Sequence, residues 1–250
     1  MNIAIIGYGK MGHEIEKVAN SKNVSVVSIV DPAHGSHREI NDQSMKGVDV
    51  CVDFSVPGAV AGNVEKIAKY KKNIVIGTTG WYSNIDEVKK IIEKNNLGLI
   101  YAPNFSIGVN VFLDIIKNAA RLINKIEDYD IYGYELHHSK KLDSPSGTAK
   151  AICDILVENI KRKNSVVFEK LDRKIEPNEL HFASVRSGFI PGTHVVGFDS
   201  SADTIELKHS ARNREGFAVG AVTAAQWIYN KKGFFEIKDM MKDIVGDQNA

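Results

Sequence analysis

Cysteine is scarce in this chain of 250 residues, which contains only Cys51 and Cys153. Two thiols so far apart predict neither a disulfide framework nor a thiolate metal site, so a reduced cytoplasmic compartment is expected. Long hydrophobic runs are also lacking, and no stretch approaches the ~18 apolar residues of a membrane-spanning helix. The apolar residues 3–6 follow no basic segment, so no secretory signal is expected there. We therefore expect no membrane partner.

Neither positive nor negative charge predominates in the chain. The chain has 32 basic and 31 acidic residues, which gives a formal net charge of +1, and no block of like charge occurs. This balance predicts no nucleic-acid partner. The hydrophobic share of 43% and the charged share of 25% are ordinary for a globular protein. The length is enough for one large domain or two small ones.

Short β-branched runs alternate with amphipathic stretches over the first hundred residues. The runs are apolar on both faces, which is typical of a parallel sheet covered by helices. Right-handed crossovers then predict a doubly wound α/β sheet, the Rossmann architecture, over residues 1–108. The expected strands are 3–6, 24–30, 48–54, 73–76 and 97–101, and the expected helices are 10–21, 58–71 and 85–96.

The pattern changes after residue 107. A long helix, residues 109–126, is followed by mixed strand and helix signals that predict an inserted α+β domain with an open mixed sheet, residues 109–213. Residues 214–250 are expected to return to the first domain, with a helix at 217–229 and a strand or short helix at 234–244. The inserted domain is expected to contain strands 129–138, 181–187, 193–199 and 204–210, a helix at 147–161, and a hairpin at 200–202.

A glycine-rich turn, Gly7-Tyr8-Gly9-Lys10-Met11-Gly12, lies between the first strand and the first helix. In such a turn the first glycine bends the chain, the second lets pyrophosphate approach, and the third lets helix pack on strand. Asp31 ends the next strand near the ~20-residue spacing of a ribose-binding acid. The arrangement favours a nicotinamide dinucleotide over a tight turn without a ligand.

Two later loops are expected beside this turn, because ligands bind outside the carboxyl ends of strands in open α/β sheets. One loop holds Gly77, Thr78 and Thr79, whose hydroxyls and backbone N–H groups suit the cofactor. The other holds Ala102, Pro103, Asn104 and Phe105, with Phe105 placed to lie against a nicotinamide ring. Asp53 and Ser55, after the third strand, are interpreted as turn residues.

The densest polar segment is residues 135–149. His137, His138 and Lys141 precede the helix start Ser146-Gly147-Thr148, so imidazoles, an ammonium group and helix N–H groups are expected to form an anion site with acid–base capacity. Lys140 is interpreted as solvated surface. No metal is expected, because adjacent histidines on a strand point to opposite faces and no further ligand lies at the required spacing.

Taken together, these blocks resemble the dihydrodipicolinate reductase family over essentially the whole chain. The match includes the glycine turn, residues 77–80, residues 102–110 and the highly specific segment 135–149. Two later pieces, Val185-Arg186-Ser187-Gly188 and Gly192-Thr193-His194, resemble its substrate-domain strands. The glycine turn is one residue shorter than in many members, and Ser139 and Lys140 stand where some members have Arg and His.

The resemblance implies NAD(P)H-dependent reduction of 4-hydroxy-tetrahydrodipicolinate, a small dicarboxylate, in diaminopimelate and lysine biosynthesis, by a homotetramer assembled through the sheets of the second domain. It makes His137 the catalytic histidine and Lys141 the acid, and gives substrate-carboxylate contacts to His138, Gly147 and Thr148. The cofactor contacts it implies are Gly7, Tyr8, Gly9, Lys10, Met11, Gly12, Asp31, Gly77, Thr78, Thr79, Ala102, Pro103, Asn104 and Phe105.

The choice of cofactor and the class of function leave alternatives. Asp31 would repel a 2′-phosphate, so NADH is expected to be preferred or used together with NADPH. His34, His37 and Arg38 follow closely and offer cations to a phosphate. Another Rossmann dehydrogenase acting on a small carboxylate and an NAD(H)-binding redox sensor stay open as alternatives at this point.

Overall fold

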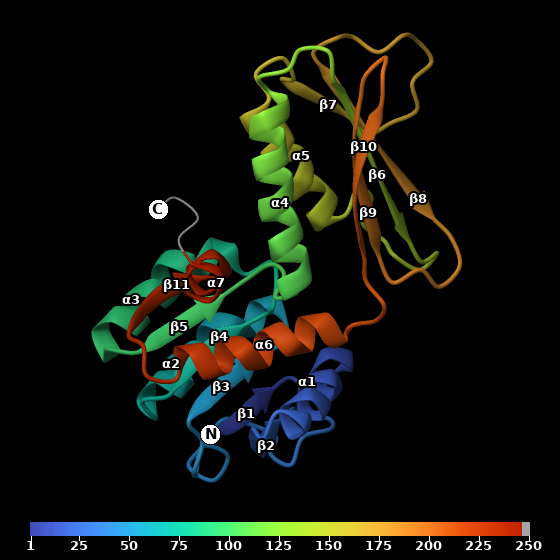
Figure 1. The fold of residues 1–250 in the computed structure, drawn as a ribbon. Helices are drawn as coiled ribbons and strands as arrows, with labels where there is room; N and C mark the ends of the chain where they lie inside the picture. Colours follow the sequence, from blue (N-terminus) through green and yellow to red (C-terminus); the bar gives the residue numbers. More distant parts are fainter. Residues whose placement is uncertain (247–250) are drawn as a thin grey trace. The chain divides into compact units, whose positions relative to one another are not determined.

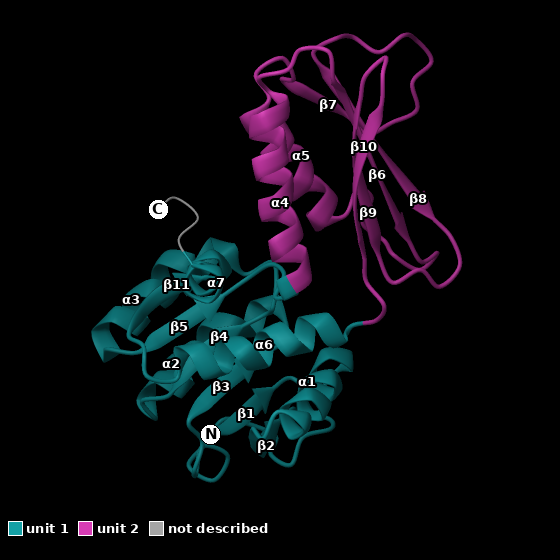
Figure 2. Ribbon diagram, viewed as in Figure 1, with its two compact units in different colours: residues 1–107, 214–250 teal, residues 108–213 magenta. Residues whose placement is uncertain are grey.

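The computed structural model describes residues 1–246, and the chain divides into two compact units (Figure 2). Unit 1 comprises Met1–Ile107 and Arg214–Ala250, and unit 2 comprises Gly108–Asn213. The boundaries expected from the sequence lie within one residue of these. Among the described residues, no helix is both long and apolar enough to cross a bilayer.

Unit 1 is built on a six-stranded sheet in which every neighbouring pair is parallel (Figure 1). This arrangement confirms the predicted doubly wound architecture. In spatial order the strands are β11 (Gly233–Glu236), β5 (Gly98–Tyr101), β4 (Asn73–Ile76), β3 (Val50–Asp53), β1 (Asn2–Ile6) and β2 (Ser25–Val30).

Helices bury both faces of this sheet. Ile3 and Ile5 of β1 pack into one core, whereas Ala4 and Ile6 pack into the other. Because side chains alternate along a strand, burial on both faces requires the unbroken apolar run that the sequence shows. The first core contains α1 (Lys10–Ser21), α6 (Glu215–Ile228) and α7 (Ile237–Val245), and the second contains α2 (Val60–Lys69) and α3 (Ile85–Asn95).

The last described segment is both strand and helix. The sequence left residues 234–244 open between these two possibilities, and β11 passes directly into α7. β11 pairs in parallel with β5, with Phe234 opposite Leu99, so the end of the chain extends the sheet of unit 1. Short 3-10 turns, η1 (Pro57–Ala59) and η2 (Tyr82–Asn84), precede α2 and α3.

Unit 2 contains a five-stranded mixed sheet, as expected. β6 pairs in parallel with β8 and antiparallel with β9, which also pairs antiparallel with β10. The three-residue strand β7 was not predicted, because a half-buried segment of that length has no readable period. The strands, in spatial order, are β10 (Thr204–Ser210), β9 (Thr193–Asp199), β6 (Asp130–His137), β8 (Glu179–Arg186) and β7 (Ser165–Val167).

Two helices, α4 (Ile107–Ile123) and α5 (Gly147–Asn159), pack their apolar sides with the strands in one core. Along β6 every second residue is buried, beginning at Ile131, which belongs to this core. Glu135 and His137 have the same parity as Ile131, so both point toward the helix-covered side. A carboxylate and an imidazole therefore occupy positions that the strand pattern otherwise gives to core residues.

Candidate functional site

The glycine turn has the geometry that its three glycines require. Gly7 has φ +88°, and a Cβ there would lie 2.6 Å from the Phe54 carbonyl oxygen. A Cβ on Gly12 would lie 2.6 Å from the Gly7 oxygen, so neither position accepts a side chain. Gly9, the N-cap of α1, faces open space with no atom within 4 Å of such a Cβ. The helix N-terminus is thus left accessible, which suits a pyrophosphate.

Asp31 ties the end of β2 to this turn. Its Oδ2 accepts a hydrogen bond of 2.8 Å from the Tyr8 N–H, and its Oδ1 accepts from the N–H groups of Ala33 and His34. The Tyr8 and Ala33 bonds hold the pKa of the Asp31 carboxyl below its usual value. Asp31 is therefore ionised, and because each carboxylate oxygen has two lone pairs, Oδ2 has one left for a ribose hydroxyl.

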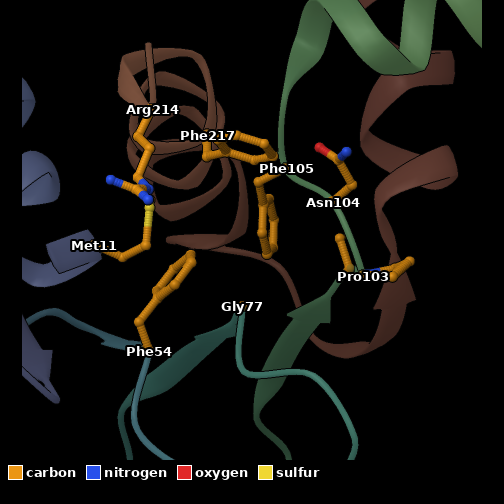
Figure 3. Close-up of a pocket in the computed structure, with 9 residues that line it drawn as sticks. Met11, Phe54, Gly77, Pro103, Asn104, Phe105, Arg214 and Phe217 are labelled. Carbon is orange, nitrogen blue, oxygen red and sulfur yellow. The ribbon is translucent and has the colours of Figure 1, made fainter. Parts of the chain in front are cut away.

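A pocket of about 220 Å³ lies beside the predicted cofactor loops (Figure 3). It is smaller than the ~300–1,000 Å³ sites of drug-sized ligands, so it would hold one part of a dinucleotide. Six predicted cofactor residues line it: Met11, Gly77, Ala102, Pro103, Asn104 and Phe105. Phe54, Arg214 and Phe217 complete the lining, and the figure shows the rings of Phe54, Phe105 and Phe217 around the pocket together with the side chains of Arg214 and Asn104.

Asp53 organises the loops under this pocket. Its buried carboxylate accepts hydrogen bonds from Ser55, from the Asn63 amide and from the Thr78 hydroxyl. The Thr78 hydroxyl, expected to contact the cofactor, is thus directed inward, and Thr79 is exposed. This geometry agrees with the interpretation of Asp53 and Ser55 as turn residues.

The polar cluster of unit 2 is assembled by strand pairing. Glu135 on β6 lies opposite His194 on β9, and His137 lies opposite Arg186 on β8. The parallel strands β6 and β8 end at the same edge of the sheet, and the antiparallel β9 begins there. Four side chains from three strands therefore converge at the point where the chain leaves β6 for α5.

Glu135 is fully buried and lies at the centre of this cluster. Its Oε1 accepts hydrogen bonds from the Ser146 N–H at 2.9 Å, the Ser184 hydroxyl at 2.8 Å and the Arg186 guanidinium at 2.7 Å. Its Oε2 lies 3.3 Å from a ring nitrogen of His137 and 3.3 Å from one of His194. These two approaches lack hydrogen-bond geometry and are electrostatic contacts.

Burial alone would raise the pKa of Glu135, but the neighbouring His194 ring, the Ser146 donors and the Arg186 guanidinium together outweigh that effect. They hold the pKa of this carboxyl well below its usual range, so Glu135 is ionised. Burial also lowers the pKa of the His137 imidazole from 6.5 to about 4, although the charge of Glu135 opposes the shift. His137 is therefore neutral at pH 7.

The segment after β6 carries the other predicted residues. Lys141 is half-buried, and its ammonium forms an ion pair of 2.7 Å with Asp143. Ser146 caps α5 by accepting from the Ala149 N–H, and the first turn of α5 contains no acidic residue. Among the remaining predicted positions His138 and Thr148 are half-buried and Gly147 is exposed; Lys140, interpreted as surface, is also exposed.

The buried cluster also contains the residue types that bind metal ions. One atom each of Glu135, His137 and His194 lie within 4.8 Å of one another, a grouping of residue types that can hold a metal ion. The Arg186 guanidinium contacts the other oxygen of Glu135 and supplies a permanent positive charge at the same place. A dication would be repelled by it, so we interpret the cluster as an ion-pair network.

The structure adds residues that the sequence did not single out as site residues. Arg214 and Phe217 lie at the beginning of α6 and line the pocket. In the sequence, the signal that could have indicated them was an arginine followed by an aromatic residue at a helix start. Glu135, Arg186 and His194 lie within the sequence motifs described above, but the sequence assigned no function to them. Their contacts depend on strand register, which the sequence does not display.

Comparisons with known proteins agree over nearly the whole chain. A family model described as dihydrodipicolinate reductase, N-terminus, matches residues 1–105, and one described as dihydrodipicolinate reductase, C-terminus, matches residues 108–241. The 4-hydroxy-tetrahydrodipicolinate reductase of Christiangramia forsetii is 40% identical, with 98% of this chain and 99% of that protein covered. That of Rickettsia bellii is 35% identical, with 98% and 96% covered.

A solved structure supports the fold. A dipicolinate-bound dihydrodipicolinate reductase from Paenisporosarcina sp. TG-14 aligns with a TM-score of 0.76 at 24% identity. The alignment covers 96% of this chain and 99% of that one, so both units have counterparts there.

Proposed function

Because the chain belongs to the dihydrodipicolinate reductase family, we propose that it reduces 4-hydroxy-tetrahydrodipicolinate in diaminopimelate and lysine biosynthesis. The observation that carries this proposal is the match of both family models, one to residues 1–105 and the other to residues 108–241. An unrelated Rossmann dehydrogenase would not account for the second match, and the activity assay distinguishes the reductase from an NAD(H)-binding redox sensor.

The direct test is oxidation of reduced nicotinamide by the purified protein. We expect oxidation of NADH or NADPH only when freshly generated product of the preceding synthase is present. Reactions without that product and reactions without the protein are the controls. If neither cofactor is oxidised in a substrate-dependent manner, the proposed activity is wrong.

The residues of unit 1 fit a nicotinamide dinucleotide. The open space at Gly9 faces the N-terminus of α1, where helix N–H groups attract a pyrophosphate. Phe105 and Phe54 offer apolar surface to a ring in the pocket, and we expect the amide of Asn104, which also lines the pocket, to bond a carboxamide. When bound, the reduced cofactor supplies the hydride, and the protein supplies position and electrostatic field.

We assign proton supply to Lys141 and an accessory role to His137. With loss of the 4-hydroxyl as water, a substrate carbon conjugated with a C=N bond would accept the hydride. Negative charge would then collect toward the ring nitrogen, and a proton would be needed there. His137 is neutral at pH 7 because burial lowers its pKa to about 4, so it cannot serve as an imidazolium acid. Lys141 lies in the same segment, and its amine is ion-paired with Asp143.

The start of α5 is proposed to bind the substrate carboxylates. Helix N–H groups at Gly147 and Thr148 favour an anion, and no acidic residue in the first turn opposes it. His138 precedes this turn and can add a further hydrogen bond. A dicarboxylate would thus be held by backbone dipoles and nearby cations.

For the cofactor we propose NADH, or dual use of NADH and NADPH. The ionised carboxylate of Asp31 can accept from ribose hydroxyls and would repel a 2′-phosphate. His34 follows within the same turn, and a cation there would moderate the repulsion. The preference is measured as kcat/KM for both cofactors under the same conditions.

A homotetramer is proposed for the assembly. On β6, Tyr132 and Tyr134 are half-buried and point away from the helix-covered core, and Val185 on the adjacent strand β8 lies opposite Leu136 and is exposed on the same face. A sheet face with this apolar and aromatic content suits contact with further copies of the chain. Light scattering during size-exclusion chromatography should give four times the chain mass; a monomer mass would contradict this assembly.

A further inference from the structure

The two oxygens of the buried Glu135 carboxylate have different surroundings. Its Oε1 is saturated by three donors, from Ser146, Ser184 and Arg186. These contacts compensate for most of the cost of burying a charge. Among the described residues its Oε2 has no hydrogen-bond partner, and it lies 3.3 Å from a ring nitrogen of His137 and 3.3 Å from one of His194. The proposed mechanism uses His137 but gives no role to this second oxygen.

The position of Oε2 determines which ring nitrogen of His137 carries the proton. A neutral imidazole has one N–H donor and one acceptor nitrogen. Because Oε2 lies 3.3 Å from Nδ1, the tautomer with the proton on Nδ1 is attracted to the carboxylate, and the other tautomer directs a lone pair at it. Catalytic contacts that are long without substrate commonly tighten when it binds.

The opposite nitrogen of His137 lies against a glycine. A Cβ on Gly192 would lie 3.0 Å from Nε2, so the backbone passes close to this atom without covering it by a side chain. With the proton held on Nδ1, Nε2 has a free lone pair. The ring can then accept a proton or hydrogen bond at one nitrogen while a carboxylate stabilises the other.

We propose that Glu135 is a positioning residue that holds the proton of His137 on Nδ1 and so presents Nε2 as the acceptor in the reductase site. His194 approaches the same Oε2 at 3.3 Å and competes for it. The idea rests on the proposed function only in assigning the effect to turnover, because the position of the proton is a property of the resting protein.

The charged groups around Glu135 and His137 determine how a substitution of Glu135 should change His137. Arg186 from β8 and His194 from β9 face Glu135, and the N-terminus of α5 approaches it through Ser146. The charges of Lys141 and Arg186 both lower the pKa of His137, whereas Glu135 raises it. Removing only the charge of Glu135 therefore changes His137 twice, in its tautomer and in its affinity for protons.

The decisive variant is Glu135→Gln, because the site dictates the orientation of the new amide. Three donors converge on the Oε1 position, so the carbonyl oxygen must occupy it and the NH2 group must face the imidazoles. An NH2 donor at this position requires a lone pair on Nδ1. We therefore expect the proton of His137 to move from Nδ1 to Nε2.

The primary readout is the nitrogen-15 chemical shifts of histidine-labelled protein, with the His137 signals identified by their loss in His137→Gln. We expect a protonated Nδ1 in the wild type and a protonated Nε2 in Glu135→Gln. kcat should fall by about 10-fold or more with a smaller change in KM, by analogy with the loss of a carboxylate that orients a metal-bound histidine. The group that titrates on the acid side of the kcat profile should move to lower pH.

Two further variants keep the test decisive. Glu135→Gln leaves the charge of Arg186 buried without its partner. The double variant with Arg186→Gln removes both charges, and a protein tolerates the loss of a whole buried ion pair better than the loss of one partner. It should show the same tautomer change. Ser184→Ala removes one donor to Oε1 and leaves Oε2 in place, so Nδ1 should stay protonated.

A protonated Nε2 in the wild type, or an unchanged tautomer in both the single and the double variant, would overturn the proposal. A protein without reductase activity that still shows the tautomer change would refute the proposed function and leave the positioning role of Glu135 intact.

Discussion

Acidification should destabilise this protein through His137 before its carboxylates titrate. The unfolded imidazole takes up a proton around pH 6.5, whereas burial in the folded protein delays protonation until about pH 4. Between these values the unfolded state binds more protons, so the free energy of unfolding falls as the pH falls. From about pH 7.5 to about pH 5.5, this single group should remove about 1.3 kcal/mol.

The estimate depends little on the folded pKa, provided that it lies well below pH 5.5. Glu135 acts in a separate window: its pKa is lowered by folding, so its contribution is lost only below the unfolded carboxyl pKa of ~4.3. Burial also lowers the pKa of His209, which should add a further loss in the same window as His137.

The assay is urea unfolding at a series of pH values and a fixed protein concentration, because assembly makes apparent stability depend on concentration. His137→Gln should make the decrease between about pH 7.5 and 5.5 shallower by about 1.3 kcal/mol. His209→Gln is the comparison variant at a second buried imidazole and should also reduce the slope. An identical slope in wild type and His137→Gln would refute the argument that His137 is held neutral by burial.

Three further predictions concern activity. Lys141→Ala should lower kcat by about 100-fold or more if it supplies the proton, whereas the exposed Lys140→Ala should be mild; equal effects would contradict the assignment. Asp31→Ser should raise kcat/KM for NADPH relative to NADH, and an unchanged ratio would mean that Asp31 does not contact the ribose. Gly192→Ala should lower kcat because its Cβ would lie 3.0 Å from Nε2 of His137, and full activity would show that this nitrogen is not used.

Local signals in the sequence were sufficient for much of unit 1. The glycine turn and the strand-and-helix alternation depend on contacts within a few residues, and the parallel sheet followed from them. The loop from Ala102 to Phe105 was placed correctly beside Met11 because parallel strands end at one edge. The hydroxyl of Thr78 shows the limit of such reasoning, since its hydrogen bond to Asp53 joins two different strand ends.

Contacts between distant segments account for what was missed. Arg214 and Phe217 reach the pocket because α6 passes very close to the loop after β5. A Cβ on Gly220 would lie 1.7 Å from the Phe105 oxygen, so this glycine permits the approach. A glycine within an apolar helix looks like a weak helix former in the sequence. Only the packed structure shows that its missing side chain brings the helix to the pocket.

Both units build their candidate sites by the same physical arrangement. In unit 1, β1 ends at a turn that opens the N-terminus of α1, and Asp31 at the end of β2 binds that turn through the Tyr8 N–H. In unit 2, β6 ends at a turn that opens α5, and Glu135 binds that turn through the Ser146 N–H. A carboxylate thus fixes each helix start by accepting one backbone N–H. In unit 1 it comes from the neighbouring strand and is partly exposed, which leaves it able to meet a ligand. In unit 2 it comes from the same strand and is fully buried, so it acts on the protein groups around it.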